Sequence, residues 1–344
     1  MKKLIIVLMM LSLVLSVFAG SQKEEAKQAP VEVEKEAPKE KIKLSCGSVD
    51  AIGTPGEDTV NYMADLLKEK SNGNILLKSF PANQLGKPPD MIEQCSIGAL
   101  DIVWADISNY GPIIKDYNIF GMGYTFRDQE HLRKFLESPD YERMKDELRK
   151  TKGIITLASG AHRVPRDVFS KKPIRSAEDF VGMKFRVPGL EMYLKTFEGI
   201  GTNPVRIAYA EAYMALSQGL ADGIENPLPA GYGMKFHQVA KYIIPTGHIR
   251  TVTTFVINEK KFNGLSPEYQ QIIRDVARAG DEYFVNLMKV EKGKVIEKLK
   301  AEGAVILPAI DVTPLQKKLI PVAREMEEKG VWSKGLWERI QTIE

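Results

Sequence analysis

The sequence predicts an α/β protein of two related lobes, each a mixed sheet flanked by helices. Strands and helices alternate along residues 182–228, because the apolar residues switch between the two-residue period of a strand and the 3.6-residue period of a helix. An acidic residue followed by Ser-x-Gly-x-x-Asp at a fixed spacing occurs at 90–101 and again at 211–222. The length of 344 residues is enough for two domains with separate cores. Two equivalent helix-to-strand units therefore predict two lobes whose strand ends face each other.

The segment 182–228 carries the pattern on which the site prediction depends. Its first strand, 184–187, places Lys184 and Arg186 on the face opposite the apolar side chains. The elements that follow are a helix at 190–199, a strand at 203–207, a helix at 209–216 and a strand at 222–226. Crossover helices between strands indicate a parallel sheet, whose ligands bind at the carboxyl ends of the strands. Arg186 and Asn226 fall near such ends.

The remaining chain continues this alternation. The predicted strands are 41–46, 75–80, 101–104, 153–159, 242–244 and 251–257, and the predicted helices are 58–70, 90–97, 127–150, 266–301, 313–329 and 333–340. We expect strand 153–159 to cross between the lobes and strand 251–257 to return the chain to the first lobe. The run 266–301 begins with Ser266 as N-cap and Pro267 at the first helical position. At about 1.5 Å per residue it would be roughly 50 Å long and would lie across both lobes.

The predicted organisation has five parts. Residues 1–19 have a basic start, an apolar run and small residues near Ala19, which indicate a signal peptide cleaved there. The alternative, an uncleaved anchor, is less favoured because the apolar run is shorter than the ~20 residues that span a membrane. Residues 20–40 are nearly free of apolar side chains and predict a disordered linker. The other parts are lobe I at 41–161 with a return segment at 251–265, lobe II at 162–250, and C-terminal helices spanning both lobes at 266–344.

Composition and charge argue against several classes of protein. With 44% hydrophobic and 27% charged residues, the chain has the composition of a soluble globular protein. A net charge of +3 without a clustered basic face gives no support for a nucleic-acid partner. The four histidines lack paired metal-ligand spacing, and no nucleophile elbow, Walker loop or complete G-x-G-x-x-G occurs. The sequence therefore predicts no catalytic residues and no cofactor. Cys46 and Cys95 are either paired or two buried thiols.

Two motifs link this pattern to a known family. The stretches KFRVPG and AYAEAYMALSQGLADGIENPL, in residues 184–228, resemble the core signature of substrate-binding proteins of tripartite ATP-independent periplasmic (TRAP) transporters, DctP type. The resemblance extends over about 41–320. It implies a periplasmic-binding-protein-like fold, a periplasmic location, and a small carboxylate ligand delivered to integral-membrane permease subunits driven by an ion gradient. It also implies a monomer. The alternatives are a receptor of an ATP-driven importer and an exported α/β enzyme.

Arg186 and Asn226 are the first candidates for ligand binding. A planar, permanently charged guanidinium can hold a carboxylate through two parallel hydrogen bonds. The alternative for Arg186 is an interior ion pair with an acid such as Asp222. By resemblance, Arg186 matches the carboxylate-binding arginine of the family's RVPG motif. Asn226 matches the ligand-contacting asparagine of its ENP motif, and the alternative for Asn226 is a turn cap.

The other candidates are Arg166, Tyr209, Trp104 and Asp106. Arg166 keeps the family's spacing for a second ligand arginine, although Arg163 lies nearby and a solvated basic loop is the alternative. Tyr209 matches an aromatic position that packs on the ligand, and a core aromatic is the alternative. Trp104 and Asp106, at the mirrored strand end of the first lobe, would form the opposite wall.

The loop after QLG departs from some relatives. It reads Lys87-Pro88-Pro89, where relatives that bind amino sugars carry acids. This loop therefore argues against assigning the substrate of those relatives to this chain. The choice among a dicarboxylate, a 2-oxo acid and a sugar acid stays open at this point, as does a bridging metal ion.

Overall fold

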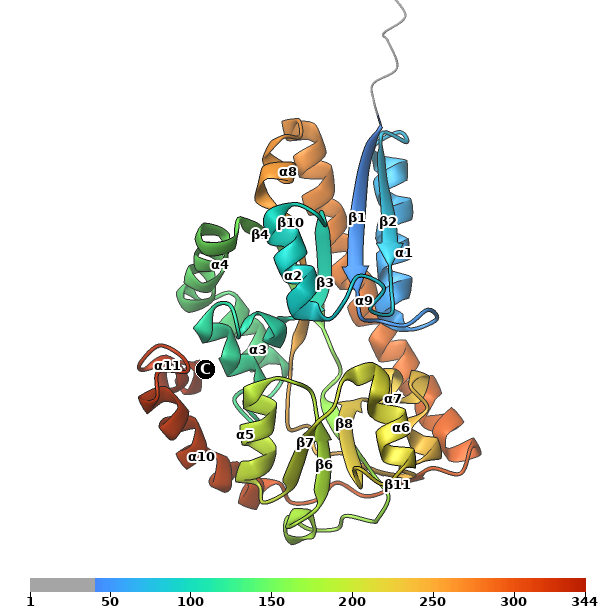
Figure 1. Ribbon diagram of the computed structural model, residues 1–344, viewed down its shortest axis with the longest axis vertical. Helices are drawn as coiled ribbons and strands as arrows, with labels where there is room; N and C mark the ends of the chain where they lie inside the picture. Colours follow the sequence, from blue (N-terminus) through green and yellow to red (C-terminus); the bar gives the residue numbers. More distant parts are fainter. Residues whose placement is uncertain (1–40) are drawn as a thin grey trace, which may run out of the picture. The chain divides into compact units, whose positions relative to one another are not determined.

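Two mixed sheets flanked by helices make up residues 41–344, the part of the chain that the computed structural model describes (Figure 1). The described residues form one compact unit. This architecture confirms the predicted α/β fold class. The predicted signal peptide and linker, residues 1–40, lie outside the described residues.

The first lobe contains a five-stranded sheet in the order β2-β1-β3-β10-β4. Its strands are β1 (Ile42–Ser48), β2 (Ile75–Phe80), β3 (Ile102–Asp106), β4 (Ile154–His162) and β10 (Val252–Asn258). Strands β2, β1 and β3 run parallel, whereas β10 is antiparallel to both of its neighbours. The chain thus returns from the second lobe to place β10 in the middle of this sheet.

The second lobe contains a six-stranded sheet in the order β11-β9-β5-β8-β6-β7. Its strands are β5 (Arg166–Ser170), β6 (Lys184–Val187), β7 (Asn203–Arg206), β8 (Gly223–Pro227), β9 (Tyr242–Ile244) and β11 (Val305–Ile306). Strands β7, β6 and β8 run parallel, and β5 is antiparallel to β8 and β9. From β7 to β9 the order and directions repeat those of β2 to β4. The internal sequence repeat therefore corresponds to equivalent units, α2-β3 and α6-β8.

Helices flank both sheets and connect the lobes. They are α1 (Pro55–Lys70), α2 (Pro88–Ile97), α3 (Gln129–Leu136), α4 (Pro139–Lys152), α5 (Glu191–Gly199), α6 (Ala212–Ser217), α7 (Leu228–Gly233), α8 (Glu259–Asn263), α9 (Pro267–Ala301), α10 (Thr313–Glu328) and α11 (Leu336–Gln341). Short 3₁₀ turns include η1 (Ile107–Tyr110) and η2 (Lys115–Gly121). Among these helices, none combines the length and apolar character needed to span a bilayer.

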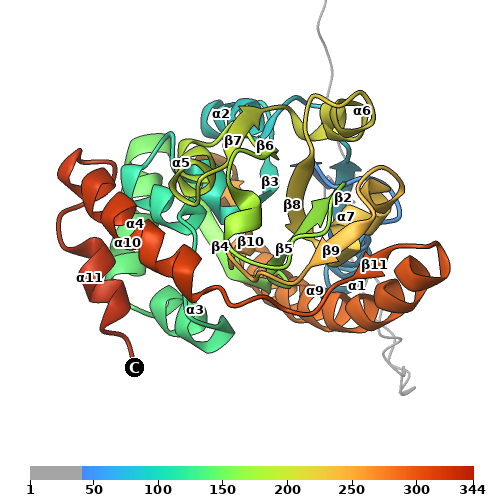
Figure 2. The same ribbon diagram turned by 90° about the horizontal axis from the view of Figure 1, so that it is seen from below.

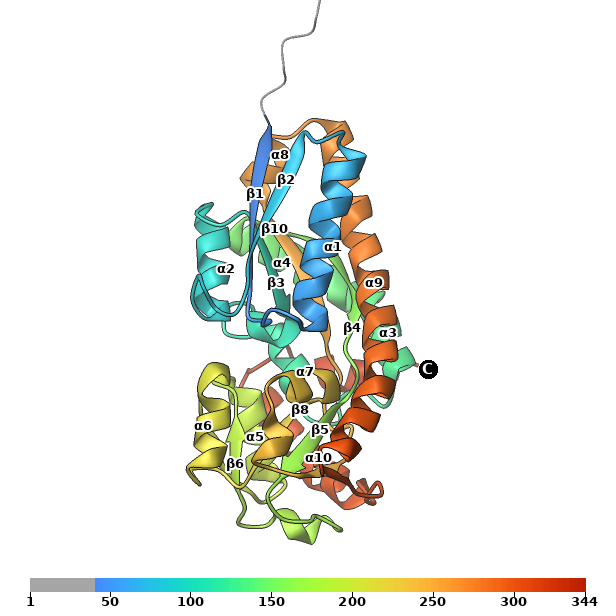
Figure 3. The same ribbon diagram turned by 90° about the vertical axis from the view of Figure 1, so that its right-hand side faces the viewer.

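Helix α9 runs along both lobes, as its length predicts. It contacts α1 and β4 in the first lobe and α7 and β11 in the second, and Figure 3 shows it beside both sheets. Ser266 caps its first turn by accepting a hydrogen bond from the backbone N–H of Tyr269. The C-terminal helices α10 and α11 pack on the other side, where α10 contacts α5 (Figure 2).

Two short connections cross between the sheets. Residues 163–165 join β4 to β5, and residues 245–251 join β9 to β10. Backbone hydrogen bonds tie the two crossings together, from Arg163 N to Thr251 O (3.1 Å) and from Arg166 N to Ile249 O (3.1 Å). Because Arg163 and Arg166 lie at this crossing, their side chains are held next to both lobes.

The structure decides two questions that the sequence left open, the conformation around Arg166 and the state of the two cysteines. The basic segment around Arg166 is a central strand, β5, whose residues are all buried. It therefore is not a solvated loop, because pairing with β8 and β9 satisfies its backbone on both sides. Cys46 and Cys95 are both buried and free, which decides between the two possibilities in favour of two thiols.

Candidate ligand-binding site

Arg186 is a buried cation with one anchoring partner. It lies near the carboxyl end of β6, in register with Ile224 of β8, and is only 1% exposed. Its Nε donates to the carbonyl of Ile207 (3.0 Å), and the ring of Tyr209 lies 5.8 Å from its Cζ. Within residues 41–344, no carboxylate forms an ion pair with it, Asp222 included. Its terminal nitrogens therefore remain available for an external anion.

Burial lowers the pKa of Arg186 to about 10, although the carboxylate of Glu225 counteracts this shift. The guanidinium thus stays charged at neutral pH. A buried charge without an ionic partner is costly, and such a cost is typical of a functional site rather than of a structural ion pair.

Arg166 is already neutralised by Glu225. The strands β5 and β8 are antiparallel, with Val168 opposite Glu225, so Arg166 and Glu225 are diagonal neighbours on one face of the sheet. The guanidinium donates through Nε to Oε2 and through Nη2 to Oε1 (3.0 Å). Burial alone would lower the pKa of Arg166, but Glu225 raises it and the net shift is upward. His248 Nε2 also lies 3.7 Å from the Glu225 carboxylate.

Asn226 and Tyr209 connect the two arginines. The amide of Asn226 donates to the hydroxyl of Tyr209 (2.9 Å), and its Oδ1 accepts from Arg166 Nη2 (3.5 Å). Asn226 therefore links Arg166 to Tyr209, whose ring lies beside Arg186, and does not act as a turn cap. The ring of Tyr209 packs edge-on against Phe236, so it has a core contact as well as a polar one.

On the first lobe, Asp50 is held by two side chains. The indole N–H of Trp104 donates to Asp50 Oδ2 (3.1 Å), and Arg163 Nη2 lies 3.6 Å from Asp50 Oδ1. Trp104 itself is 0% exposed and packs against Phe255 and Phe284. The role of Trp104 as a wall against the ligand stays a prediction, while in this structure the ring packs in the core and its N–H positions Asp50.

Asp106 is also occupied by local contacts. Its Oδ1 accepts from the backbone and hydroxyl of Ser108 (3.0 and 2.7 Å), and its Oδ2 accepts from Thr251 (2.7 Å). Arg163 Nη1 lies 3.9 Å from the same oxygen and donates to Thr253 (3.1 Å). Asp106 thus caps η1 and borders the Arg163 group.

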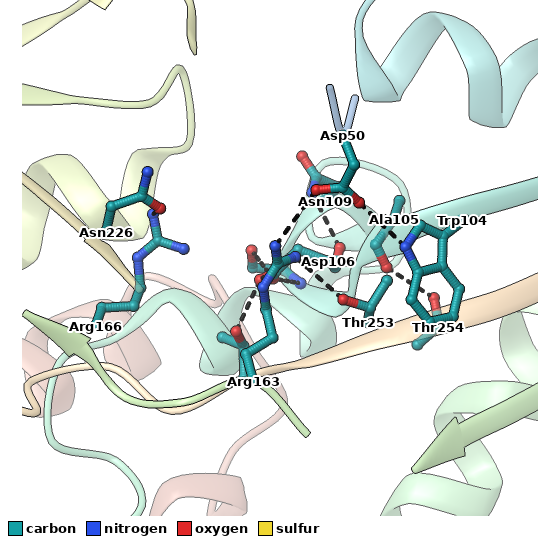
Figure 4. Close-up of polar contacts among 12 residues, drawn as sticks. Asp50, Trp104, Ala105, Asp106, Asn109, Arg163, Arg166, Asn226, Thr253 and Thr254 are labelled. Atoms are coloured by element: carbon teal, nitrogen blue, oxygen red, sulfur yellow. Dashed lines mark hydrogen bonds and ion pairs between the residues drawn. The ribbon is translucent and has the colours of Figure 1, made fainter. Parts of the chain in front are cut away.

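Figure 4 shows these side chains as two groups, with Arg166 and Asn226 on one side and Arg163, Asp50 and Asp106 on the other. The groups act on each other electrostatically. Burial raises the pKa of Tyr209, donation from Asn226 lowers it, and across the lobes Asp50 raises it and Arg163 lowers it. Asp50 and Arg163 of the first group are therefore close enough to Tyr209 to affect its ionisation. Among residues 41–344, no cluster of three or more His, Cys, Asp or Glu side chains could hold a metal ion.

Residues 46–329 match the family described as bacterial extracellular solute-binding protein, family 7. The chain belongs to this family. This chain is 30% identical over 288 residues to the sialic acid-binding periplasmic protein SiaP of Vibrio cholerae serotype O1. The alignment covers 83% of this chain and 88% of that protein. The chain is 29% identical over 267 residues to the 2,3-diketo-L-gulonate-binding periplasmic protein YiaO of Escherichia coli K12, covering 78% and 81%.

A solved structure has the same fold. The TRAP periplasmic solute-binding protein of Pseudomonas putida F1, with bound D-glucuronate, superimposes with a TM-score of 0.80 at 29% identity and covers 88% of this chain and 98% of that chain. The predicted resemblance to TRAP substrate-binding proteins is thereby confirmed. This family 7 protein is an extracytoplasmic receptor of the type that works with TRAP membrane subunits.

Three residues of the site were not among the predicted ligand residues. Glu225 directly precedes the predicted Asn226, and its pairing with Arg166 follows from a strand that sequence reasoning did not recognise. Asp50 lies in a loop, with no periodic pattern to mark it. The sequence offers Arg163 only as an alternative to Arg166. In the structure the two arginines have different partners, because Arg163 lies beside Asp50 and Arg166 pairs with Glu225.

Proposed function

We propose that this protein captures a sugar acid, a polyhydroxylated monocarboxylate, between its lobes in the periplasm and delivers it to TRAP permease subunits. The observation that carries the proposal is Arg186. Its buried guanidinium has one backbone partner and lies near the carboxyl end of β6. A ligand carboxylate would supply the missing counter-charge through two parallel hydrogen bonds.

The charges of the site favour one carboxylate rather than two. Arg166 is matched by Glu225, so of these two arginines only Arg186 lacks a carboxylate partner within residues 41–344. On the first lobe, Arg163 faces two carboxylates, Asp50 and Asp106, and this group carries a net negative charge. A second ligand carboxylate would be repelled there, whereas ligand hydroxyls could donate to Asp50.

Relatives support a ligand of this class. The proteins with similar sequence or structure are named as binding sialic acid, 2,3-diketo-L-gulonate and D-glucuronate. Each of these ligands joins a carboxylate to an oxygen-rich carbon skeleton. We infer that Arg186 binds the carboxylate, that Asn226 and Arg166 border it, and that Tyr209 packs beside it.

A panel of ligands tests the proposal. Residues 41–344 would be unfolded and refolded to remove bound solute, and then melted with hexuronates, aldonates, sialic acid, C4-dicarboxylates and 2-oxo acids. A ligand at ~100 times its Kd adds about 2.7 kcal/mol, which for a protein of this size is a Tm increase of roughly 4 °C. We expect one or more sugar acids to give this increase. A response to dicarboxylates alone would contradict the charge argument, and no response to any acid would contradict carboxylate capture.

Asp50→Asn tests the role of the first lobe. The amide keeps one oxygen acceptor but removes the negative charge that strengthens hydrogen bonds from ligand hydroxyls. We expect the Kd for the sugar acid to rise about tenfold, and the Tm increase with a C4-dicarboxylate to become larger than in the wild type. Calorimetric titration with both ligands measures this. Asp58→Asn, on the nearby helix α1, is the control and should leave both unchanged.

A further inference from the structure

Strand β4 contains a β-bulge at Ser159 and Gly160, which are separated from Arg163 by two paired residues. Ala158 pairs with Phe255 of β10 and Ala161 pairs with Thr253, so Ser159 and Gly160 together oppose a single residue. A bulge leaves backbone groups outside the ladder and redirects the strand. Some other group must therefore satisfy the N–H donors at this position.

Asp281 of α9 provides that acceptor. Its Oδ2 accepts from the N–H of Gly160 (2.5 Å), and within residues 41–344 its Oδ1 has no hydrogen-bond partner. A Cβ atom at position 160 would lie 2.9 Å from Asp281 Oδ2, so glycine is required for this approach. Asp281 is only 8% exposed, and a buried aspartate on a helix is uncommon unless its hydrogen bonds are needed.

The same helix face holds Arg163. Phe284 lies one turn after Asp281 and its ring is 6.0 Å from Cζ of Arg163. Arg163 follows Ala161 by two residues and therefore points to the same face of the strand, where its Nη1 donates to Thr253, the pairing partner of Ala161. The bulge thus determines the register in which Arg163 reaches Asp50.

Losing the bulge would change that register. A shift of one residue moves each side chain of a strand to the opposite face, which would turn Arg163 away from Asp50 and Thr253. Because Asp281 accepts a hydrogen bond from the N–H of Gly160 in the bulge, it stabilises the register that this arrangement needs. It achieves this from outside the ligand site.

We propose that Asp281 is a positioning residue for solute capture, which acts by holding the β4 bulge so that Arg163 is directed toward Asp50. The inference rests on the proposed function, because that function assigns Asp50 to the ligand hydroxyls.

The surroundings of Asp281 allow its role to be separated from general stability. Glu282 and Arg278 of α9 border it, Tyr141 of α4 lies within its electrostatic reach, and an open groove of about 530 Å³ adjoins it. Burial raises the pKa of Asp281 to about 7, and the N–H groups of Gly160 and Ala161 lower it only in part. A raised pKa means that this group favours folding below its ordinary pKa and that this contribution is lost as the pH rises through about 7.

The substitutions Asp281→Asn and Asp281→Leu therefore differ in a defined way. Asparagine keeps an acceptor for the bulge without a charge, so we expect near-wild-type affinity. We also expect the Tm of Asp281→Asn to exceed the Tm of the wild type by more at pH 8 than at pH 5. Leucine removes the acceptor, so we expect the Kd of the sugar acid to rise at least tenfold. Gly160→Ala retains the carboxylate but pushes it away, and should weaken binding in the same direction even if Asp281→Leu folds poorly.

A double-mutant cycle with Arg163→Met decides whether Asp281 acts through Arg163. Calorimetric titration of the panel's best acid would be performed on the wild type, on each single variant and on the Asp281→Leu, Arg163→Met double variant, with the exposed Glu282→Gln as control. We expect the double variant to bind no more weakly than Arg163→Met alone. Unchanged binding by Asp281→Leu, or additive losses in the double variant, would overturn the inference. If the wild type binds none of the acids, the proposed function fails first and this inference fails with it.

Discussion

Replacing Arg186 by lysine is expected to raise the Kd of the bound sugar acid about a hundredfold. Hydrogen bonds to charged groups contribute about 1.5 to 3 kcal/mol each, and lysine cannot form the two parallel bonds that the guanidinium offers a carboxylate. Each 1.4 kcal/mol corresponds to a factor of ten in Kd. Isothermal titration with the refolded protein measures the change. Lys184→Arg, at an exposed position of the same strand, is the matched control and should bind as the wild type does.

The substitution Arg186→Met should stabilise the ligand-free protein although it removes acid binding. In the absence of solute, the buried guanidinium has no ionic partner among residues 41–344, so its removal relieves an unfavourable desolvation. We therefore expect Arg186→Met to abolish acid binding and to raise the Tm of the ligand-free protein. A lower Tm together with intact binding would show that Arg186 has a structural role instead.

The parts of the site that the sequence predicted depend on local patterns. The strand that carries Arg186 could be predicted because the period of 184–187 places the arginine on one face and Pro188 and Gly189 end the strand immediately afterward. Its role in ligand binding was implied by the resemblance to the RVPG motif and stays a prediction. The two-lobe arrangement could be assigned from the repeat at 90–101 and 211–222, which the matching strand orders explain. Both inferences use residues close together in the chain.

The parts that were missed depend on pairing between distant segments. Arg166 and Glu225 are 59 residues apart, and their contact is set by the antiparallel register of β5 with β8. Pro165 and the surrounding charges obscured β5, since such residues are typical of loops. Trp104 likewise lies in a predicted strand, but its burial and its bond to Asp50 depend on the packing of α9 and β10.

The largest stability change is expected from Glu225→Gln. Removing one partner of a buried ion pair costs about 3–5 kcal/mol because the other charge is left uncompensated. For a chain of this size the loss corresponds to a decrease in Tm of roughly 5–8 °C. Differential scanning calorimetry at pH 7 measures it. The exposed pair of Arg133 and Glu130 offers a control, since Glu130→Gln should leave the Tm unchanged.

The pH dependence of this loss follows from the pKa of Glu225. Burial raises that pKa, but Arg166 and His248 lower it by a larger amount. The resulting pKa lies below the ordinary value of 4.5. A depressed pKa means that the pair stabilises the fold above the unfolded pKa and that this stabilisation is lost as the pH falls through the lower, folded value. The Tm difference between the wild type and Glu225→Gln should therefore be full at pH 7 and should decrease on acidification below about 4.

Replacing both partners separates the ion pair from the space that it fills. In the double variant Arg166→Met, Glu225→Leu no unpaired charge remains, so its Tm should lie above that of Glu225→Gln, because apolar replacements of buried pairs are often neutral or stabilising. Acid binding should nevertheless weaken, since Arg166 also donates to Asn226, which borders the carboxylate in the proposed complex. A double variant that is less stable than Glu225→Gln would show that packing, and not charge compensation, is the main role of the pair.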